Sequence, residues 1–161
     1  NPQTLSPDCI GATQLRRFAH HFEDLLAAGF KPEVDVMFVG VDNNAARRAA
    51  SEYCYRNRIP LVNVAVDAQA EQAHVMIQES DGPCLACMNP GYLRDRVAPC
   101  FVPSCIDCLF AADGFALFAI TSLILGRPRA WNFRNIHLAG FVSDAPKLIE
   151  RNPHCPVCSK F

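Results

Sequence analysis

The chain has 161 residues, the size of one domain, which is long enough to bury a hydrophobic core without covalent staples. Its 15 Lys and Arg residues nearly balance 16 Asp and Glu residues, and this argues against a nucleic-acid surface or a polybasic membrane patch as the main function. Because 50% of the residues are hydrophobic and 19% are charged, the composition also argues against intrinsic disorder.

The chain contains nine cysteines, an odd number, and shows no recognisable leader peptide. Both features favour a reducing compartment, where thiols remain available for metal binding and chemistry. We therefore expect a cytoplasmic location. Because the chain opens at Asn1 rather than at Met, we also expect it to be part of a longer or processed protein.

Residues 11–28 predict an amphipathic helix, since their apolar side chains recur at helical spacing. Gly29 follows as a natural helix stop. The run VDVMFVGVDNN comes next, and its apolar part, residues 34–41, is typical of a strand that is buried on both faces.

The next two segments complete a unit of strand, helix and strand. Residues 45–58 are rich in Ala and Arg and predict a helix, which ends before Pro60 because the residue preceding a proline disfavours the helical conformation. Residues 61–66 predict the second strand. The two strands of such a unit are expected to be parallel.

In the second half, residues 73–78 predict a strand, and residues 88–105 predict a long irregular loop of the kind that often carries function. The apolar run 109–125 falls short of the ~20 residues of a membrane span, so it predicts a helix buried in the protein, beginning near Asp113. This helix should stop at Gly126 and Pro128, and residues 131–141 predict a last strand.

Two Cys-x-x-Cys pairs, Cys84 with Cys87 and Cys155 with Cys158, offer four thiolates in loop composition. This pattern suits a tetrahedral structural Zn²⁺, because two intervening residues let both sulfurs of a pair turn toward one ion. A redox dithiol is the alternative, but it requires a strand before the motif and a helix opening on it, and we expect neither pair to have that context. Disulfides are a second alternative.

The segment DNNAARRAASEYCYRNRIPLV resembles the signature of the ThiF/MoeB/HesA superfamily, which includes the ubiquitin-activating enzymes. The family pattern places Asp-Asn at the end of a strand, Arg five residues and Cys twelve residues after the Asp, and Pro-Leu-Val at the next strand. Those places are held by Asp42, Asn43, Arg47, Cys54 and the segment 60–62. The order of the two cysteine pairs agrees as well, so the resemblance covers residues 34–158.

The resemblance implies an α/β fold, a partial Rossmann-like doubly wound sheet with a zinc site of four cysteines. We expect one domain fragment over residues 1–161, with a sheet and helix part (1–87), a crossover loop (88–108) and an apolar helix, strand and zinc knuckle (109–161). No Gly-x-Gly-x-x-Gly occurs in the sequence, so the N-terminal βαβ unit that cradles ATP phosphates is expected to be missing.

The resemblance also implies ATP and Mg²⁺ as cofactors, with Asp42 as magnesium ligand and Asn43 and Arg47 on the nucleotide side. From the residues alone, Asp42 could equally cap the following helix, and Arg47 could have a structural or ion-pairing role. Cys105, before the apolar helix, matches the place where some relatives carry a thioester-forming or persulfide-forming cysteine. Its neighbour Cys108 fits a buried apolar role better.

Two functions stay open at this point. The first is the C-terminal part of an activating enzyme that adenylates the carboxylate of a ubiquitin-like or sulfur-carrier protein. The second is a non-catalytic, zinc-stapled interaction module, such as an inactive subunit that partners an activating enzyme. The expected partners are the ubiquitin-like protein and either a second copy or a complementing N-terminal half. Neither nucleic acid nor a membrane is expected as a partner.

Overall fold

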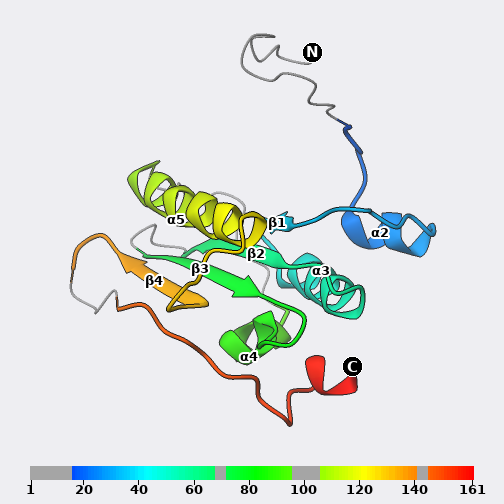
Figure 1. Ribbon diagram of the computed structural model, residues 1–161. Coiled ribbons are helices and arrows are strands. Elements are labelled where there is room, and N and C mark those ends of the chain that lie inside the picture. The colour runs from blue at the N-terminus through cyan, green and yellow to red at the C-terminus, as the bar shows by residue number, and fades with distance from the viewer. Residues whose placement is uncertain (1–15, 68–71, 96–105, 141–144) are drawn as a thin grey trace.

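The computed structural model describes residues 16–67, 72–95, 106–140 and 145–161. The chain folds as a mixed α/β structure around one four-stranded sheet (Figure 1). The elements, in chain order, are α2 (Phe22–Ala27), β1 (Met37–Val39), α3 (Asn44–Arg56), β2 (Leu61–Val66), β3 (Gln72–Gln78), α4 (Leu85–Met88), the 3₁₀ turn η1 (Pro90–Leu93), α5 (Ile106–Ile124), β4 (Phe133–His137) and the 3₁₀ turn η2 (Cys158–Lys160).

The strands lie in the order β1, β2, β3, β4. β1 and β2 are parallel and are connected through α3, which confirms the predicted unit of strand, helix and strand. β2 and β3 are antiparallel, as are β3 and β4. Because only one pair of described strands is parallel, the sheet is mixed, and a Rossmann-like doubly wound sheet is not confirmed.

Helices cover both faces of the sheet (Figure 1). On one face, valines and isoleucines of β2 and β3 pack against small residues of α5. On the other face, Leu61 and Met76 pack against Ala50 and Cys54 of α3 and Leu85 of α4. Successive strand residues therefore supply two separate cores, as the twofold period of a strand requires.

Two N-terminal predictions were too long. Residues 16–21 are not helical and α2 begins only at Phe22, while residues 11–15 lie outside the described part. Phe18 instead packs its ring against Phe30, 4.9 Å between centroids. Gly29 is confirmed as the stop, with φ of +85°. β1 has three residues rather than eight and is not buried on both faces: Phe38 is 50% exposed because β1 lies at the edge of the described sheet.

The second half also differs from the sequence-based picture. The segment predicted as an irregular loop contains η1, and α5 begins at Ile106 rather than near Asp113. Gly126, with φ of +61°, ends α5 as predicted, and the Arg127 N–H donates to the Ser122 carbonyl at 2.9 Å. β4 covers only part of the predicted strand 131–141, whose last residue lies outside the described ranges.

Helix α5 was predicted to be buried, but only one of its faces is. Within the described residues it is the one helix long and apolar enough, by length and composition, to cross a membrane. Small residues such as Ala112, Ala116 and Ala119 face the sheet, whereas large residues such as Phe110 and Leu117 are exposed. The helix thus lies along the sheet with its bulkiest apolar side chains turned outward.

Candidate functional site

The four cysteines of the two Cys-x-x-Cys pairs meet at one point, although 71 residues separate the pairs. The sulfurs of Cys84 and Cys155 are 3.5 Å apart, those of Cys87 and Cys158 are 3.5 Å apart, and those of Cys84 and Cys87 are 3.8 Å apart. A tetrahedral ion with bonds of about 2.3 Å places its sulfur ligands roughly 3.8 Å apart. The quartet therefore fits one tetrahedral divalent ion such as Zn²⁺.

Short backbone turns position these thiols. Cys84 stands at the N-cap of α4, and the Cys87 N–H donates to the Cys84 carbonyl at 3.0 Å. The expectation that neither pair opens a helix is thus wrong for the first pair. However, α4 is a single turn of four residues, and Cys84 lies closer to Cys155 than to Cys87. None of the described cysteines forms a disulfide, so the geometry favours a metal quartet over a redox dithiol.

The thiols differ in their readiness to ionise. Burial raises the pKa of Cys84 and also that of Cys87. Burial opposes ionisation of Cys155 too, but hydrogen bonds from the Cys158 and Val157 backbone and from the neighbouring thiols lower its pKa to about 7. A bound divalent cation would hold all four sulfurs as thiolates, since metal binding displaces the thiol protons.

The C-terminal thiol pair is fixed to helix α3 by aromatic and cationic side chains. Arg151 donates to the carbonyl of Cys158 at 2.7 Å and lies over the Tyr55 ring, 5.5 Å from its centroid. Arg56 lies 5.1 Å from the centroid of the Phe161 ring. The quartet thereby joins the α4 turn, the chain terminus and α3 in one packed unit, to which Tyr55 contributes a buried side chain.

Asp42 lies at the carboxyl end of β1, exposed to solvent. The helix cap that the sequence left open for Asp42 is supplied by Asn43, whose side-chain oxygen accepts a hydrogen bond of 2.7 Å from the Ala46 N–H. The Asp42 carboxylate therefore takes no part in capping. It extends from the edge where α/β proteins bind nucleotides, beyond the carboxyl ends of parallel strands.

Arg47 lies behind this edge and is 8% exposed. Its Nε donates to Oδ1 of Asn63 at 3.2 Å, a terminal nitrogen donates to the Val41 carbonyl, and the guanidinium lies 5.4 Å from the centroid of the Tyr92 ring. Burial lowers the pKa of Arg47, while the neighbouring Tyr92 and Asp42 oppose that shift. Arg47 therefore holds the end of β1 in place, in agreement with the structural alternative.

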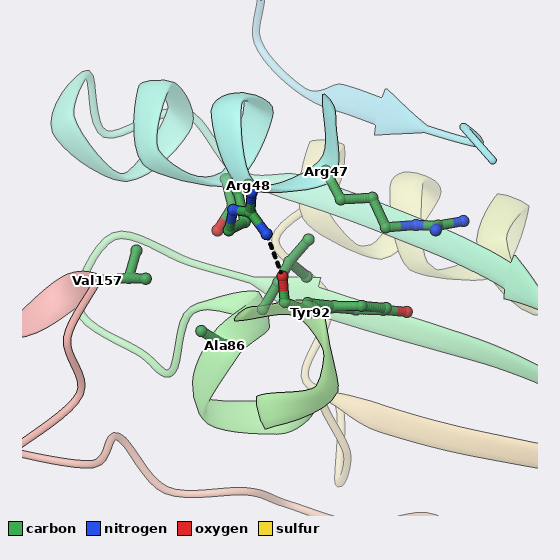
Figure 2. A pocket seen from close by; sticks show the side chains of 7 residues that line it. Arg47, Arg48, Ala86, Tyr92 and Val157 are labelled. Atoms are coloured by element: carbon green, nitrogen blue, oxygen red, sulfur yellow. Dashed lines mark hydrogen bonds between the residues drawn. The ribbon is translucent and has the colours of Figure 1, made fainter. Parts of the chain in front are cut away.

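The residues of α3 also fix the turn that follows the first cysteine pair. The Asn44 amide donates to the Arg94 carbonyl at 2.7 Å, and Arg48 donates to the Tyr92 carbonyl at 3.0 Å and pairs with Asp95 at 2.6 Å. Figure 2 shows Arg47 and the Tyr92 ring extending in the same direction below α3, with Arg48 reaching the Tyr92 backbone. The start of the predicted crossover loop is thus fixed to the first half of α3.

Neither described cavity at this unit is a nucleotide cleft. The cavity of Figure 2, between α3, α4 and Val157, has a volume of about 10 Å³, on the order of one water molecule. A larger groove of about 530 Å³ lies between Lys31, Asp35, Tyr53 and Asn57, at the end of β1 opposite to Asp42. A nucleotide site at Asp42 would need walls from outside the described residues.

Comparison with known proteins agrees with this geometry. The family model described as "ThiF family" matches residues 4–157, which is nearly the whole sequence. The chain belongs to the ThiF family. No curated protein matches it in sequence.

Solved structures share the fold of this ThiF-family chain at low sequence identity. Escherichia coli MccB with SeMet MccA has a TM-score of 0.67 and 16% identity, over 88% of this chain and 45% of that chain. Escherichia coli MccB with ATP has a TM-score of 0.65 and 16% identity, over 88% and 43%. The heterocyclase TruD has a TM-score of 0.50 and 13% identity, over 84% and 24%. The chain thus spans less than half the length of these proteins.

Sequence reasoning missed several polar residues of this ThiF-family site. Asn63 and Gln78 are 0% and 1% exposed, and both interrupt or end strands that are otherwise apolar. The Asn63 amide also donates to the Tyr92 hydroxyl at 3.3 Å. A polar side chain inside a buried strand needs partners, and that signal could have identified both residues. Cys105, the expected nucleophile, lies outside the described residues.

Proposed function

We propose that this chain forms the second half of a ThiF-type adenylating enzyme that activates the C-terminal carboxylate of a ubiquitin-like or sulfur-carrier protein. The observation that carries the proposal is Asp42. It is exposed at the carboxyl end of β1, and Asn43 takes the cap of α3, so no local structural role explains the acidic side chain.

In the proposed reaction, a carboxylate oxygen of the carrier protein attacks the α-phosphorus of ATP. A bond from this oxygen to phosphorus forms, the bond to the bridging oxygen breaks, and pyrophosphate leaves with the electron pair. Asp42, with Asn43 beside it, would hold the Mg²⁺ that neutralises the phosphate charge, since Mg²⁺ prefers carboxylate oxygen. Arg47 would keep the end of β1 in position for that contact.

The other walls of the nucleotide site are proposed to come from a missing half. The chain spans less than half the length of MccB, whose structures include one with ATP. In addition, β1 is a parallel strand at the edge of the described sheet, and parallel strands are normally covered on both sides. A further strand beside β1, from the same polypeptide or from another, would meet this requirement.

We further propose that the ion in the cysteine quartet is Zn²⁺ and that its role is structural. All four positions of the tetrahedron are taken by sulfur, and this leaves no open position for catalysis. The ion would tie the α4 turn to the chain terminus and to α3. We propose a cytoplasmic location, where the thiols stay reduced.

The deciding experiment is exchange of radiolabelled pyrophosphate into ATP, measured on the full-length protein that contains this chain, with and without its carrier protein. We expect exchange that depends on the carrier. Asp42→Asn should lower it by about 100-fold or more, the scale seen when one group that stabilises transition-state charge is lost. Asp35→Asn, an exposed carboxylate ahead of β1, is the matched control and should leave exchange unchanged.

A second candidate function is a non-catalytic interaction module that partners an activating enzyme. The buried quartet and its packing on α3 would serve such a scaffold equally well. This candidate predicts no pyrophosphate exchange and no heat of ATP binding by calorimetry in the full-length protein, together with binding to an activating enzyme or to a ubiquitin-like protein. That combination would replace the enzymatic proposal.

A further inference from the structure

Helix α5 is packed in the reverse of the usual sense. Its sheet-facing side carries small residues, Cys108, Ala112, Ala116, Ala119 and Ser122. Its outer side carries large apolar residues that are 48% to 68% exposed, and these are Ile106, Phe110, Leu117, Phe118, Ile124 and, just after the helix, Leu125. An amphipathic helix of a monomer places its large apolar residues inward.

The exposed side chains make one continuous surface. At 100° per residue, Ile106, Phe110, Leu117 and Ile124 fall on one stripe along the helix. From their exposed fractions, the six large residues offer roughly 700 Å² of accessible surface, near the ~800 Å² that each partner buries in a standard interface. A patch of this size normally marks an interaction site.

Gly114 lies in the centre of the stripe and is exposed. A Cβ added there would have no neighbour within 4 Å among the described atoms, so the packing of this chain does not require glycine. A glycine inside a helix is destabilising relative to alanine because it loses more conformational freedom. Its place is explained if another backbone or a large side chain approaches the helix at this point.

The order of large and small residues along the stripe indicates which surface that is. The four central positions are Phe110, Gly114, Leu117 and Thr121, at spacings of four, three and four. If two copies of α5 pack antiparallel about a twofold axis, Phe110 of one copy faces Thr121 of the other, and Leu117 faces Gly114. Each large side chain then meets a small one, as interdigitating helices require.

We infer that the outer face of α5 is a twofold interface with a second copy of this chain, with its centre between Gly114 and Leu117. A lipid surface or an unrelated protein would accept this apolar face, but neither explains why large and small positions match about the midpoint of the helix itself. Only a self-complementary interface has that requirement. The inference does not depend on the adenylation chemistry, since α5 lies across the sheet from α3 and the cysteine quartet (Figure 1).

Sedimentation equilibrium of the metal-loaded chain over micromolar concentrations provides the test. The parent chain should have the mass of a dimer. Leu117→Glu and Gly114→Leu should each raise the dissociation constant by about 100-fold or more, as expected for central interface residues. Leu148→Glu, which changes an equally exposed leucine outside α5, should leave the dimer intact. Circular dichroism and metal content should be unchanged in all variants.

Mixing two variants distinguishes self-association from binding of a lipid or an unrelated protein. Leu117→Lys alone and Leu117→Glu alone should be monomers, and their mixture should form a dimer, because the two Leu117 side chains lie near the same twofold axis. A chain that is monomeric throughout would overturn the inference. It would also be overturned by a dimer that withstands Leu117→Glu, or by a monomer that binds phosphatidylcholine vesicles through Leu117.

Discussion

Ser51 of α3 donates a hydrogen bond of 2.5 Å to the side-chain oxygen of Gln78 at the end of β3. Both residues are buried, and the Gln78 amide nitrogen donates back to the Ser51 carbonyl at 2.9 Å. The same Gln78 oxygen accepts from the Leu85 N–H at 3.1 Å, at the first residue of the turn between Cys84 and Cys87. One glutamine thus joins α3, the sheet and the metal turn.

Gln78→Leu should destabilise the chain by about 3 kcal/mol or more, because it leaves the Leu85 N–H and two polar groups of Ser51 buried without partners. Ser51→Ala should cost only about 1 kcal/mol, since the Gln78 oxygen keeps its bond to Leu85. Urea unfolding measures both values. Metal release to a chelator should also be faster in Gln78→Leu than in Ser51→Ala. Equal unfolding midpoints for the two variants would show that Gln78 does not organise the turn.

Removal of the metal should unfold the C-terminal part. Binding to thiolates that are disordered in the unfolded chain contributes directly to folding free energy. Cys84→Ser, or a strong zinc chelator, should therefore lower the melting temperature sharply or cause aggregation, and elemental analysis should give one zinc per parent chain. Cys105→Ser should keep the parent melting temperature, since Cys105 is not part of the quartet. Equal melting curves for Cys84→Ser and the parent would contradict the metal assignment.

The sequence predicted the elements whose signals are local. Strand β2 has the predicted bounds, because an unbroken run of mostly β-branched residues follows Pro60. The cysteine quartet was predicted as well, because the spacing within each pair restricts the geometry regardless of the fold between them. Gly29 and Gly126 were found because left-handed helix ends favour glycine.

Other features depend on contacts that no local pattern encodes. The absence of helix before Phe22 accompanies a ring contact of Phe18 with Phe30, and the exposure of Phe38 depends on which strand forms the sheet edge. Composition showed that α5 is apolar, but not which side faces the sheet, since both sides are apolar. The roles of Asn63 and Gln78 likewise appear only when α3 and the turn after β3 come together.

Arg58, just after α3, has a left-handed backbone conformation with φ of +57°, which side chains other than glycine adopt at a cost. Its position matches that of Gly29 and Gly126 at the ends of α2 and α5. Arg58→Gly should therefore stabilise the fold by about 1 kcal/mol. Arg58→Ala removes the same exposed side chain but keeps the strained conformation, so it should give no gain. Urea unfolding of the two variants decides, and equal stabilities would rule out strain at this position.

His74 of β3 should make the fold sensitive to mild acid. Burial lowers its pKa below the ordinary value of 6.5; Asp67 and a hydrogen bond with Asn135 oppose this shift, and Arg47 adds to it. Above pH 6.5, His74 is neutral in both the folded and the unfolded chain. Below it, the unfolded chain binds a proton that the folded chain binds only at lower pH, so stability falls as the pH falls.

The measurement is the free energy of unfolding at several pH values below about 6.5. His74→Gln should reduce the loss of stability with falling pH relative to the parent chain, because the titrating group is gone. His20→Gln, an exposed histidine outside the sheet, is the matched control and should retain the parent slope. Acid also releases metal from the thiolates, but all three chains carry the same quartet, so that contribution cancels in the comparison. Identical slopes for His74→Gln and the parent would mean that His74 is protonated equally well in the folded chain.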